Sequence, residues 1–119
     1  AEAMRQRWTQ YEMLGKLAKQ YQAQNFIMMG DFNTTGFNLR SEDFERFDHV
    51  LSSTSMQTMS EKLACTSYWS GTLGNGRHQS SVLDHIILED EIVSSVDQVF
   101  LGSHCAKMAC KDATPEELG

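Results

Sequence analysis

The sequence has 119 residues, of which 40% are hydrophobic and 22% charged, and its formal net charge is −6. This length and composition describe one globular domain, because domains typically contain ~50–250 residues and disordered chains are poorer in apolar residues. No apolar run approaches the ~18–20 residues of a membrane-spanning helix, and the acidic balance excludes the basic surface of a tight, non-specific nucleic-acid binder.

An amphipathic helix is the first predicted element, over residues 4–21. Its larger side chains recur at steps of three and four residues, which places them on one stripe of a helix. The four apolar residues 26–29 follow, and such a short unbroken run is typical of a strand that is buried on both faces of a sheet. The beginning of the chain therefore predicts a helix packed on a sheet.

The second predicted helix begins after Ser41, which is a good cap, and its apolar face carries Phe44, Phe47 and Leu51. Residues 52–60 are weakly patterned and are expected to form a loop with a short helix at most. The remaining predicted elements are strands at 66–69, 82–88 and 96–101, a glycine-rich turn at 71–76, and a short helix opened by Thr114 and Pro115. This order of helices and strands predicts an α/β fold.

Polar residues follow or interrupt two of the predicted strands. Asp31 and Asn33 come directly after the first strand, where they would face the same side, and Asp84 interrupts residues 82–88. A buried ionised carboxylate is costly unless it is paired or binds a cation. Two carboxylates and an amide suit Mg²⁺ or Mn²⁺ and a phosphoryl oxygen. Two alternatives stay open: Asp31 and Asn33 can form a turn by bonding their own backbone, and Asp84 can face water at a strand edge.

Other candidate residues have less specific surroundings. His85 is expected to face the side opposite Asp84 as an ordinary semi-buried residue, and Arg77 is either a phosphate contact or a solvated loop residue. Residues 31–42 nearly satisfy the loop pattern of an EF-hand calcium site. Thr35 is a poor ligand in that pattern, and a strand is expected where an EF-hand has its entering helix. A calcium-binding module is therefore the weaker alternative.

The three cysteines are too few and too widely spaced for a disulfide scaffold. Cys65, Cys105 and Cys110 contain no CxxC pair, so a structural zinc site is not expected. One disulfide together with one free thiol remains an open alternative.

Three segments, in this order, resemble the endonuclease/exonuclease/phosphatase superfamily. They are Phe-Ile-Met-Met-Gly-Asp-Phe-Asn at residues 26–33, Thr-Ser-Tyr-Trp at 66–69 and Leu-Asp-His-Ile-Ile-Leu at 83–88, where His85 replaces the commoner tyrosine. The resemblance extends over residues 4–101. It implies a four-layered α/β sandwich, with a mixed or mostly antiparallel sheet covered by helices, that hydrolyses phosphate esters with Mg²⁺ or Mn²⁺.

The resemblance also implies roles for individual residues. Asp31 would orient or deprotonate the attacking water, or protonate the leaving oxygen, and contribute to the metal site. Asn33 would hold water and phosphate beside it. Asp84 would orient the catalytic histidine and favour its charged form. Trp69 and Arg77 would border the substrate.

The chain also departs from the family pattern. Family domains have a first half that supplies a metal-ligating glutamate, and they end in a Ser-Asp-His motif. Residues 102–105 are the nearest match to that motif but lack its aspartate. We therefore expect residues 1–119 to be a single partial domain, the C-terminal half, with its catalytic histidine beyond Gly119 and no activity by itself.

Partners follow from the same resemblance. The expected substrate is a phosphate ester of a nucleic acid, a phosphoinositide or a phospholipid headgroup, and the expected protein partner is the N-terminal half of the domain. Apolar faces without a covering layer would favour self-association. The alternative from another class is a non-catalytic interaction domain that keeps the fold.

Overall fold

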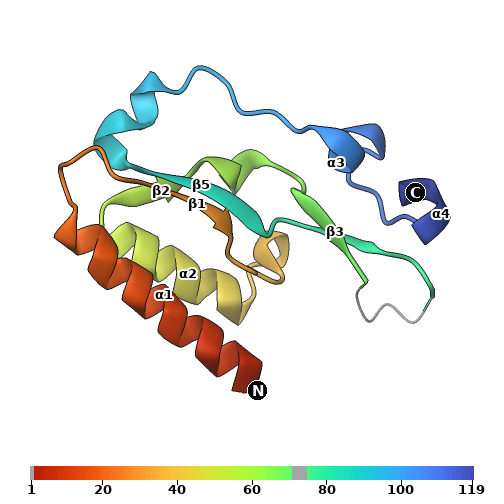
Figure 1. Cartoon of the computed structure of the whole chain (residues 1–119), viewed down its shortest axis with the longest axis horizontal. Coiled ribbons are helices and arrows are strands. Elements are labelled where there is room, and N and C mark those ends of the chain that lie inside the picture. The colour runs from red at the N-terminus through yellow and green to blue at the C-terminus, as the bar shows by residue number, and fades with distance from the viewer. Residues whose placement is uncertain (1, 71–74) are drawn as a thin grey trace.

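The computed structural model, which describes residues 2–70 and 75–119, has a layer of helices packed on one face of an antiparallel sheet (Figure 1). This sheet has three strands in the order β1-β5-β2, and β3 pairs with β4 in a separate two-stranded sheet. The α/β class and the mostly antiparallel pairing are thus confirmed, with two sheets where one was expected. The helices and strands are α1 (Glu2–Gln20), β1 (Ile27–Asp31), α2 (Glu42–Ser53), β2 (Met56–Thr58), β3 (Ser67–Trp69), β4 (Gln79–Ser81), β5 (Asp84–Glu89), α3 (Ser103–Lys107) and α4 (Pro115–Leu118).

The three predicted helices, over residues 4–21, after Ser41 and after Thr114, are confirmed as α1, α2 and α4. The sequence signals that predict them are local. The Ser41 hydroxyl accepts a hydrogen bond from the Phe44 N–H at 3.3 Å and so caps α2. Thr114 caps α4 through a capping box with Glu117. The apolar faces of α1 and α2 meet the sheet in one core, whose buried members are Tyr11, Ala18, Met28, Phe37, Phe44, Phe47, Leu51, Met56, Val82 and Ile87.

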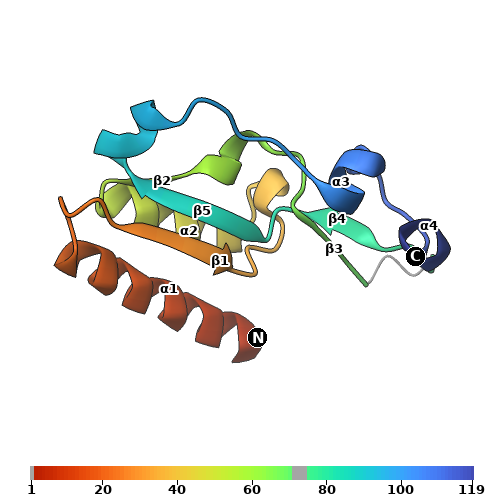
Figure 2. The same cartoon turned by 45° about the horizontal axis from the view of Figure 1, so that its top comes forward.

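Strand β1 is buried on one face only, so the prediction of a strand buried on both faces is wrong. Met28 is buried, whereas Ile27 and Met29 are 50% and 74% exposed. The reason is that β1 pairs with β5 alone among the described strands, and the two long helices cover one side of the sheet (Figures 1 and 2). We call the other side, which carries Ile27, Met29 and Ile86, the outer face.

The sequence predicts a single strand over residues 82–88, but the structure does not have one there. Strand β4 ends at Ser81, the chain turns at Val82 and Leu83, and β5 begins at Asp84. The Thr66 hydroxyl accepts hydrogen bonds from the N–H groups of Leu83 (3.0 Å) and Asp84 (2.9 Å), so a side chain takes the place of a strand partner there. Asp84 therefore opens a strand and does not interrupt one.

Two other predicted segments differ from the structure. Residues 52–60 contain β2, and residues 96–101 are irregular and follow a 3₁₀ helix at Asp90–Ser95. This irregular segment passes over the outer face (Figure 2), where it finds no strand partner among the described residues. The turn predicted at 71–76 falls mostly outside the described residues. No helix within the described ranges has the length and apolar character needed to cross a membrane.

Gly30 provides a test of the β1 backbone, because it has a φ of 150° and a Cβ added there would have no atom within 4 Å. Only backbone strain then opposes a side chain, and Gly30→Ala is expected to lower the free energy of unfolding by about 1–2 kcal/mol in urea titrations. Gly102, with equal free space and a φ of −121°, is the matched control. Equal losses in Gly30→Ala and Gly102→Ala would contradict the strain at Gly30.

Candidate functional site

The two candidate carboxylates lie opposite each other on neighbouring strands. Asp31, the last residue of β1, pairs in register with Asp84, the first residue of β5. The Phe32 N–H donates to the Leu83 carbonyl at 2.8 Å, which marks Asp31 and Asp84 as a non-hydrogen-bonded pair. In such a pair the Cα atoms are ~4.5 Å apart and both side chains point to the same face. The pairing therefore places the two aspartates side by side at the end of the outer face.

The surroundings do little to neutralise these two charges. The Asp31 carboxylate accepts one hydrogen bond, from the Asn33 N–H at 2.8 Å. The Asp84 carboxylate is half-buried and accepts no hydrogen bond from the part of the chain that the structure describes. Like charges directly opposite each other destabilise a strand pair. The pair is therefore a place where a cation would be favourable.

Asn33 lies outside β1 in a left-handed conformation, with a φ of 52°. Its N–H bonds the Asp31 carboxylate, which is the local turn that aspartate favours after a strand. The expectation that Asp31 and Asn33 share one side of a strand is therefore wrong, and the turn alternative holds. The turn nevertheless keeps Asn33 next to the carboxylate pair.

His85 faces the opposite side of the sheet from Asp84, as expected, and is only 2% exposed. Its Nε2 lies 2.7 Å from the Thr34 hydroxyl, and its Nδ1 lies 2.7 Å from the Thr58 hydroxyl. The rings of Phe37 and Phe47 pack around it at centroid distances of 5.1 and 4.7 Å. Burial lowers the pKa of His85 to about 4, so the imidazole is neutral near pH 7. His85 thus anchors β5 beneath the carboxylate pair.

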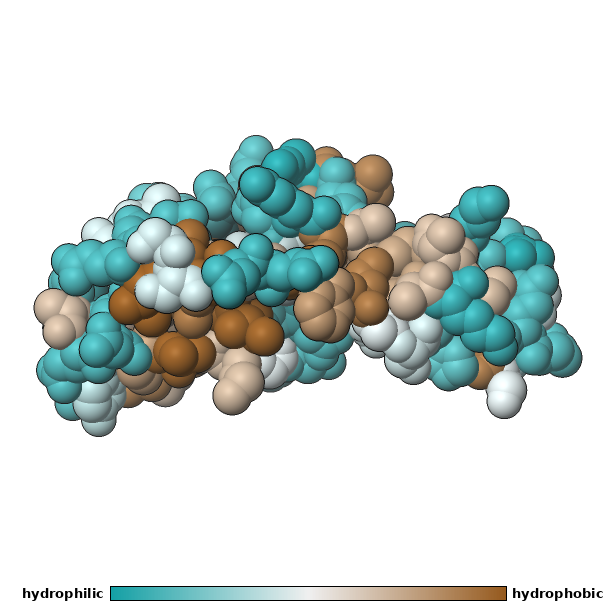
Figure 3. All heavy atoms as spheres, turned by 90° about the horizontal axis from the view of Figure 1, so that it is seen from above, coloured by the Kyte–Doolittle hydropathy of each residue, from teal (hydrophilic) through white to brown (hydrophobic). Residues whose placement is uncertain are grey.

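A mostly apolar hollow of about 440 Å³ adjoins Asp84 on the outer face. Its walls include Met29 and Ile86 from the sheet and Val99 and Phe100 from the irregular segment. Hydrophobic side chains gather on this side of the molecule when it is viewed from above (Figure 3). The hollow gives the Asp84 carboxylate an apolar neighbourhood, in which its charge is less well screened than in water, whereas Asp31 is exposed.

Trp69 and Arg77 belong to a different part of the molecule, and neither lines this hollow. The Trp69 indole N–H donates to the Ser81 hydroxyl at 2.9 Å within the two-stranded sheet. Arg77 donates to the Asp112 carbonyl at 2.7 Å and lies 3.4 Å from the Glu117 carboxylate. In this structure the guanidinium of Arg77 therefore holds the C-terminal tail.

Residues 31–42 lack the architecture of an EF-hand. Strand β1 leads into this segment where an EF-hand has a helix, and a 3₁₀ helix at Phe37–Leu39 lies within it. These features argue against a calcium-binding module, which was already the weaker alternative from the sequence.

Sequence reasoning missed the parts that two residues play in positioning the site. Thr66 fixes the start of β5 through its hydroxyl, and the Ser60 hydroxyl donates to the Asp84 carbonyl at 2.9 Å. Both act on the backbone of Asp84 from segments distant in sequence. Thr66 stands in one of the segments that resemble the superfamily, but nothing in the sequence marks its contact with Asp84, and Ser60 stands in none of those segments.

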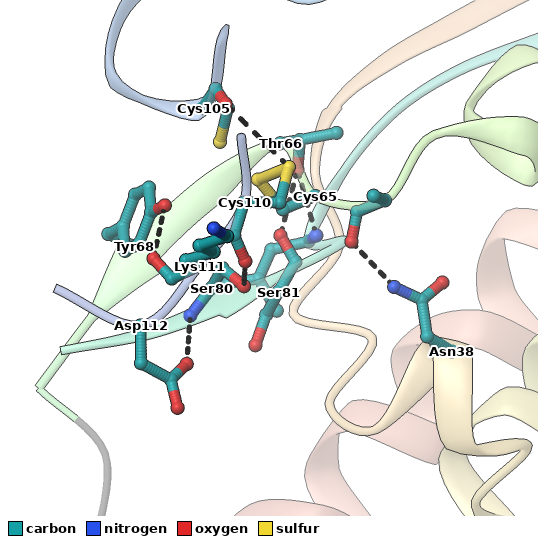
Figure 4. The surroundings of a disulfide bond; sticks show 12 residues. Asn38, Cys65, Thr66, Tyr68, Ser80, Ser81, Cys105, Cys110, Lys111 and Asp112 are labelled. Carbon is teal, nitrogen blue, oxygen red and sulfur yellow. Dashed lines mark hydrogen bonds between the residues drawn. A yellow bond between two sulfur atoms is a disulfide. The ribbon is translucent and has the colours of Figure 1, made fainter. Parts of the chain in front are cut away.

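The cysteines adopt the arrangement that the sequence left open. Cys65 and Cys110 form a disulfide, and Cys105 is free and buried (Figure 4). Burial and the nearby Asp84 carboxylate raise the pKa of the Cys105 thiol. This thiol is therefore protonated near pH 7 and a weak nucleophile.

Comparisons of the chain with models of protein families, with curated protein sequences and with solved structures each found no match.

Proposed function

We propose that this chain is part of a metal-dependent phosphoesterase of the endonuclease/exonuclease/phosphatase type, either nuclease-like or phosphatase-like. The observation that carries the proposal is the register pairing of Asp31 with Asp84 at one end of the outer face. Like charges on directly opposed strand positions repel each other, and a cation beside them would relieve that repulsion. Oxygen donors of this kind are the ligands that Mg²⁺ and Mn²⁺ prefer.

The residues present suit a hard divalent cation. Asp31 would hold Mg²⁺ or Mn²⁺ together with water and ligands from outside residues 1–119. Such a cation supplies Lewis-acid polarisation of a phosphoryl oxygen. Asp31 would also accept a proton from the attacking water, and the Asn33 amide would donate to a phosphoryl oxygen. Asp84 would orient a histidine and favour its charged form, because a neighbouring carboxylate raises the pKa of an imidazole.

The outer face supports the proposal that a further layer packs on this sheet. Met29 and Phe100 are 74% and 76% exposed, and they lie beside the exposed Ile27 and Ile86. The Cα radius of gyration is 15.2 Å, whereas a compact chain of this length has about 13.5 Å. A contiguous apolar surface of this kind marks an interaction site. The N-terminal half of the proposed domain is its natural cover, and self-association is the outcome when that half is absent.

The substrate class stays broad within this proposal. A phosphate ester of a nucleic acid, a phosphoinositide or a phospholipid headgroup would present the same phosphoryl oxygens to Asn33. A cation held by Asp31 would contact the phosphoryl oxygens that all of these esters share, so the site residues carry no information about the leaving group.

Replacing either carboxylate tests the proposal on this chain without an activity assay. Millimolar Mn²⁺ is expected to raise the free energy of unfolding of the unmodified protein, because the cation binds the folded state. Asp84→Asn removes the repulsion with Asp31 and is expected to raise the metal-free stability by about 0.2–1 kcal/mol. Asp31→Asn removes the proposed metal ligand and should abolish most of the response to Mn²⁺, whereas Asp84→Asn should only weaken it.

The matched control is Asp48→Asn, which changes an exposed carboxylate on α2, away from the pair. This control should keep the full response to Mn²⁺ in urea titrations. An unchanged response in the Asp31→Asn, Asp84→Asn double variant would reject the cation site. That result would favour the alternative of a non-catalytic interaction domain.

A further inference from the structure

The three cysteines form a cluster that the proposed phosphoesterase site does not use. Their Sγ atoms all lie within 4.8 Å of one another, although Cys65 precedes β3 and the other two lie in and after α3 (Figure 4). Cys65 is completely buried and Cys105 is 4% exposed. Two distant parts of the chain thus bring three soft ligand atoms to one largely water-excluded point.

We propose that, when the Cys65–Cys110 disulfide is open, the three cysteine sulfurs bind one thiophilic d¹⁰ cation of the Zn²⁺ and Cd²⁺ class. A Zn–S bond is about 2.3 Å long, so two thiolates on one tetrahedral ion lie about 3.8 Å apart. The three sulfurs all lie within 4.8 Å of one another, and small side-chain rotations after reduction would separate the Cys65 and Cys110 sulfurs and bring that of Cys105 to the same spacing. Thiolates select ions of this class over Mg²⁺ and Mn²⁺.

The chemistry of forming this site balances with a phosphine as the reductant. The phosphine gives two electrons to the disulfide and takes an oxygen from water, and the two water protons convert Cys65 and Cys110 to thiols. Binding of the cation then releases the protons of the coordinating thiols, including the proton that burial and Asp84 retain on Cys105. Cys105 lines the hollow on the outer face, through which water can reach the cluster as a fourth ligand.

The cluster keeps its geometry through contacts other than the disulfide. The Ser80 hydroxyl donates to the Cys110 carbonyl at 2.5 Å, and the Tyr68 hydroxyl donates to the Lys111 carbonyl at 2.7 Å. The Cys110 N–H also donates to the Cys105 carbonyl at 3.1 Å. We expect these bonds to hold the tail against the two-stranded sheet when the sulfur–sulfur bond is absent. The ligands are therefore positioned before the ion arrives.

The test is a Cd²⁺ titration of the phosphine-reduced chain under argon, followed by the ultraviolet sulfur-to-cadmium absorption. We expect one ion for each chain, with the absorption of three Cd–S bonds. Cys105→Ser, which retains the disulfide and can be checked for folding in its oxidised form, should show two Cd–S bonds after reduction. Its affinity should fall on the order of 100-fold, because one of three thiolates is lost.

Two controls separate this site from the carboxylate pair and from binding between chains. The Asp31→Asn, Asp84→Asn variant should keep all three Cd–S bonds, and the oxidised unmodified chain should lose the tight site. Sedimentation should show a cadmium-bound chain no larger than the metal-free one. Equal affinity in Cys105→Ser and the unmodified chain, or an ion bound between two chains, would overturn the proposal.

Discussion

Asp43→Ala is expected to lower the free energy of unfolding by about 3–5 kcal/mol, the cost of breaking a buried ion pair from one side. Asp43 is 2% exposed in the first turn of α2, where it forms an ion pair with Arg7. Its carboxylate also accepts hydrogen bonds from the Trp8 indole at 2.7 Å and the Thr35 hydroxyl at 2.5 Å. Alanine would leave the Arg7 charge and the Trp8 N–H without these partners.

Urea unfolding followed by tryptophan fluorescence measures this effect, since Trp8 is itself part of the network. Asp48→Ala, at an exposed position of the same helix, should change stability by less than about 0.5 kcal/mol. The combined variant Arg7→Met, Asp43→Asn should be more stable than the sum of its single variants predicts, because no isolated charge remains. Strict additivity would show that Arg7 and Asp43 do not act as a pair.

Acidification from pH 6.5 to about pH 4 is expected to remove about 3 kcal/mol of stability through His85 alone. The pKa of this residue falls from 6.5 to about 4 in the folded protein because burial opposes the charged form. The unfolded chain therefore binds the proton first, so stability is complete above pH 6.5 and declines as the pH falls toward 4. Each pKa unit corresponds to about 1.4 kcal/mol, which gives the expected size.

Replacing the imidazole isolates this effect from that of the carboxylates, which also titrate at low pH. His85→Gln is expected to be less stable at pH 7, because the side chain bonds Thr34 and Thr58 less well, and to lose less stability on acidification. His49→Gln changes an exposed histidine and should keep the pH dependence of the unmodified protein. Parallel stability curves for His85→Gln and the unmodified chain would show that His85 does not titrate in this range.

Local signals explain which parts of the fold the sequence predicts. The caps at Ser41 and Thr114 and the helical spacing of apolar residues act within a few positions, so the helices they mark are present in the structure. The strand boundaries depend on distant partners. Thr66 separates β4 from β5 by accepting two N–H groups, and no property of residues 82–88 reveals this. The edge position of β1 likewise depends on which strands pair with it.

The candidate site shows the same division between local and distant information. The residue types alone pointed to Asp31 and Asp84, because an ionised carboxylate at or within an apolar strand is costly unless it is paired or binds a cation. Their direct opposition depends on the register of two strands that are far apart in sequence. The pairing of the cysteines was also undetermined, because three residues allow three disulfides. The fold-back of the tail onto the two-stranded sheet selects Cys65 and Cys110.

The two carboxylates are supported unequally, because β5 lies between two strands and β1 has one described neighbour. Local opening of the edge strand β1 will therefore displace Asp31 more than Asp84. The separation of the two charges varies with this fraying. An ion bound between them would also hold the edge of the sheet in place, so the order of the neighbouring backbone would increase when the ion binds.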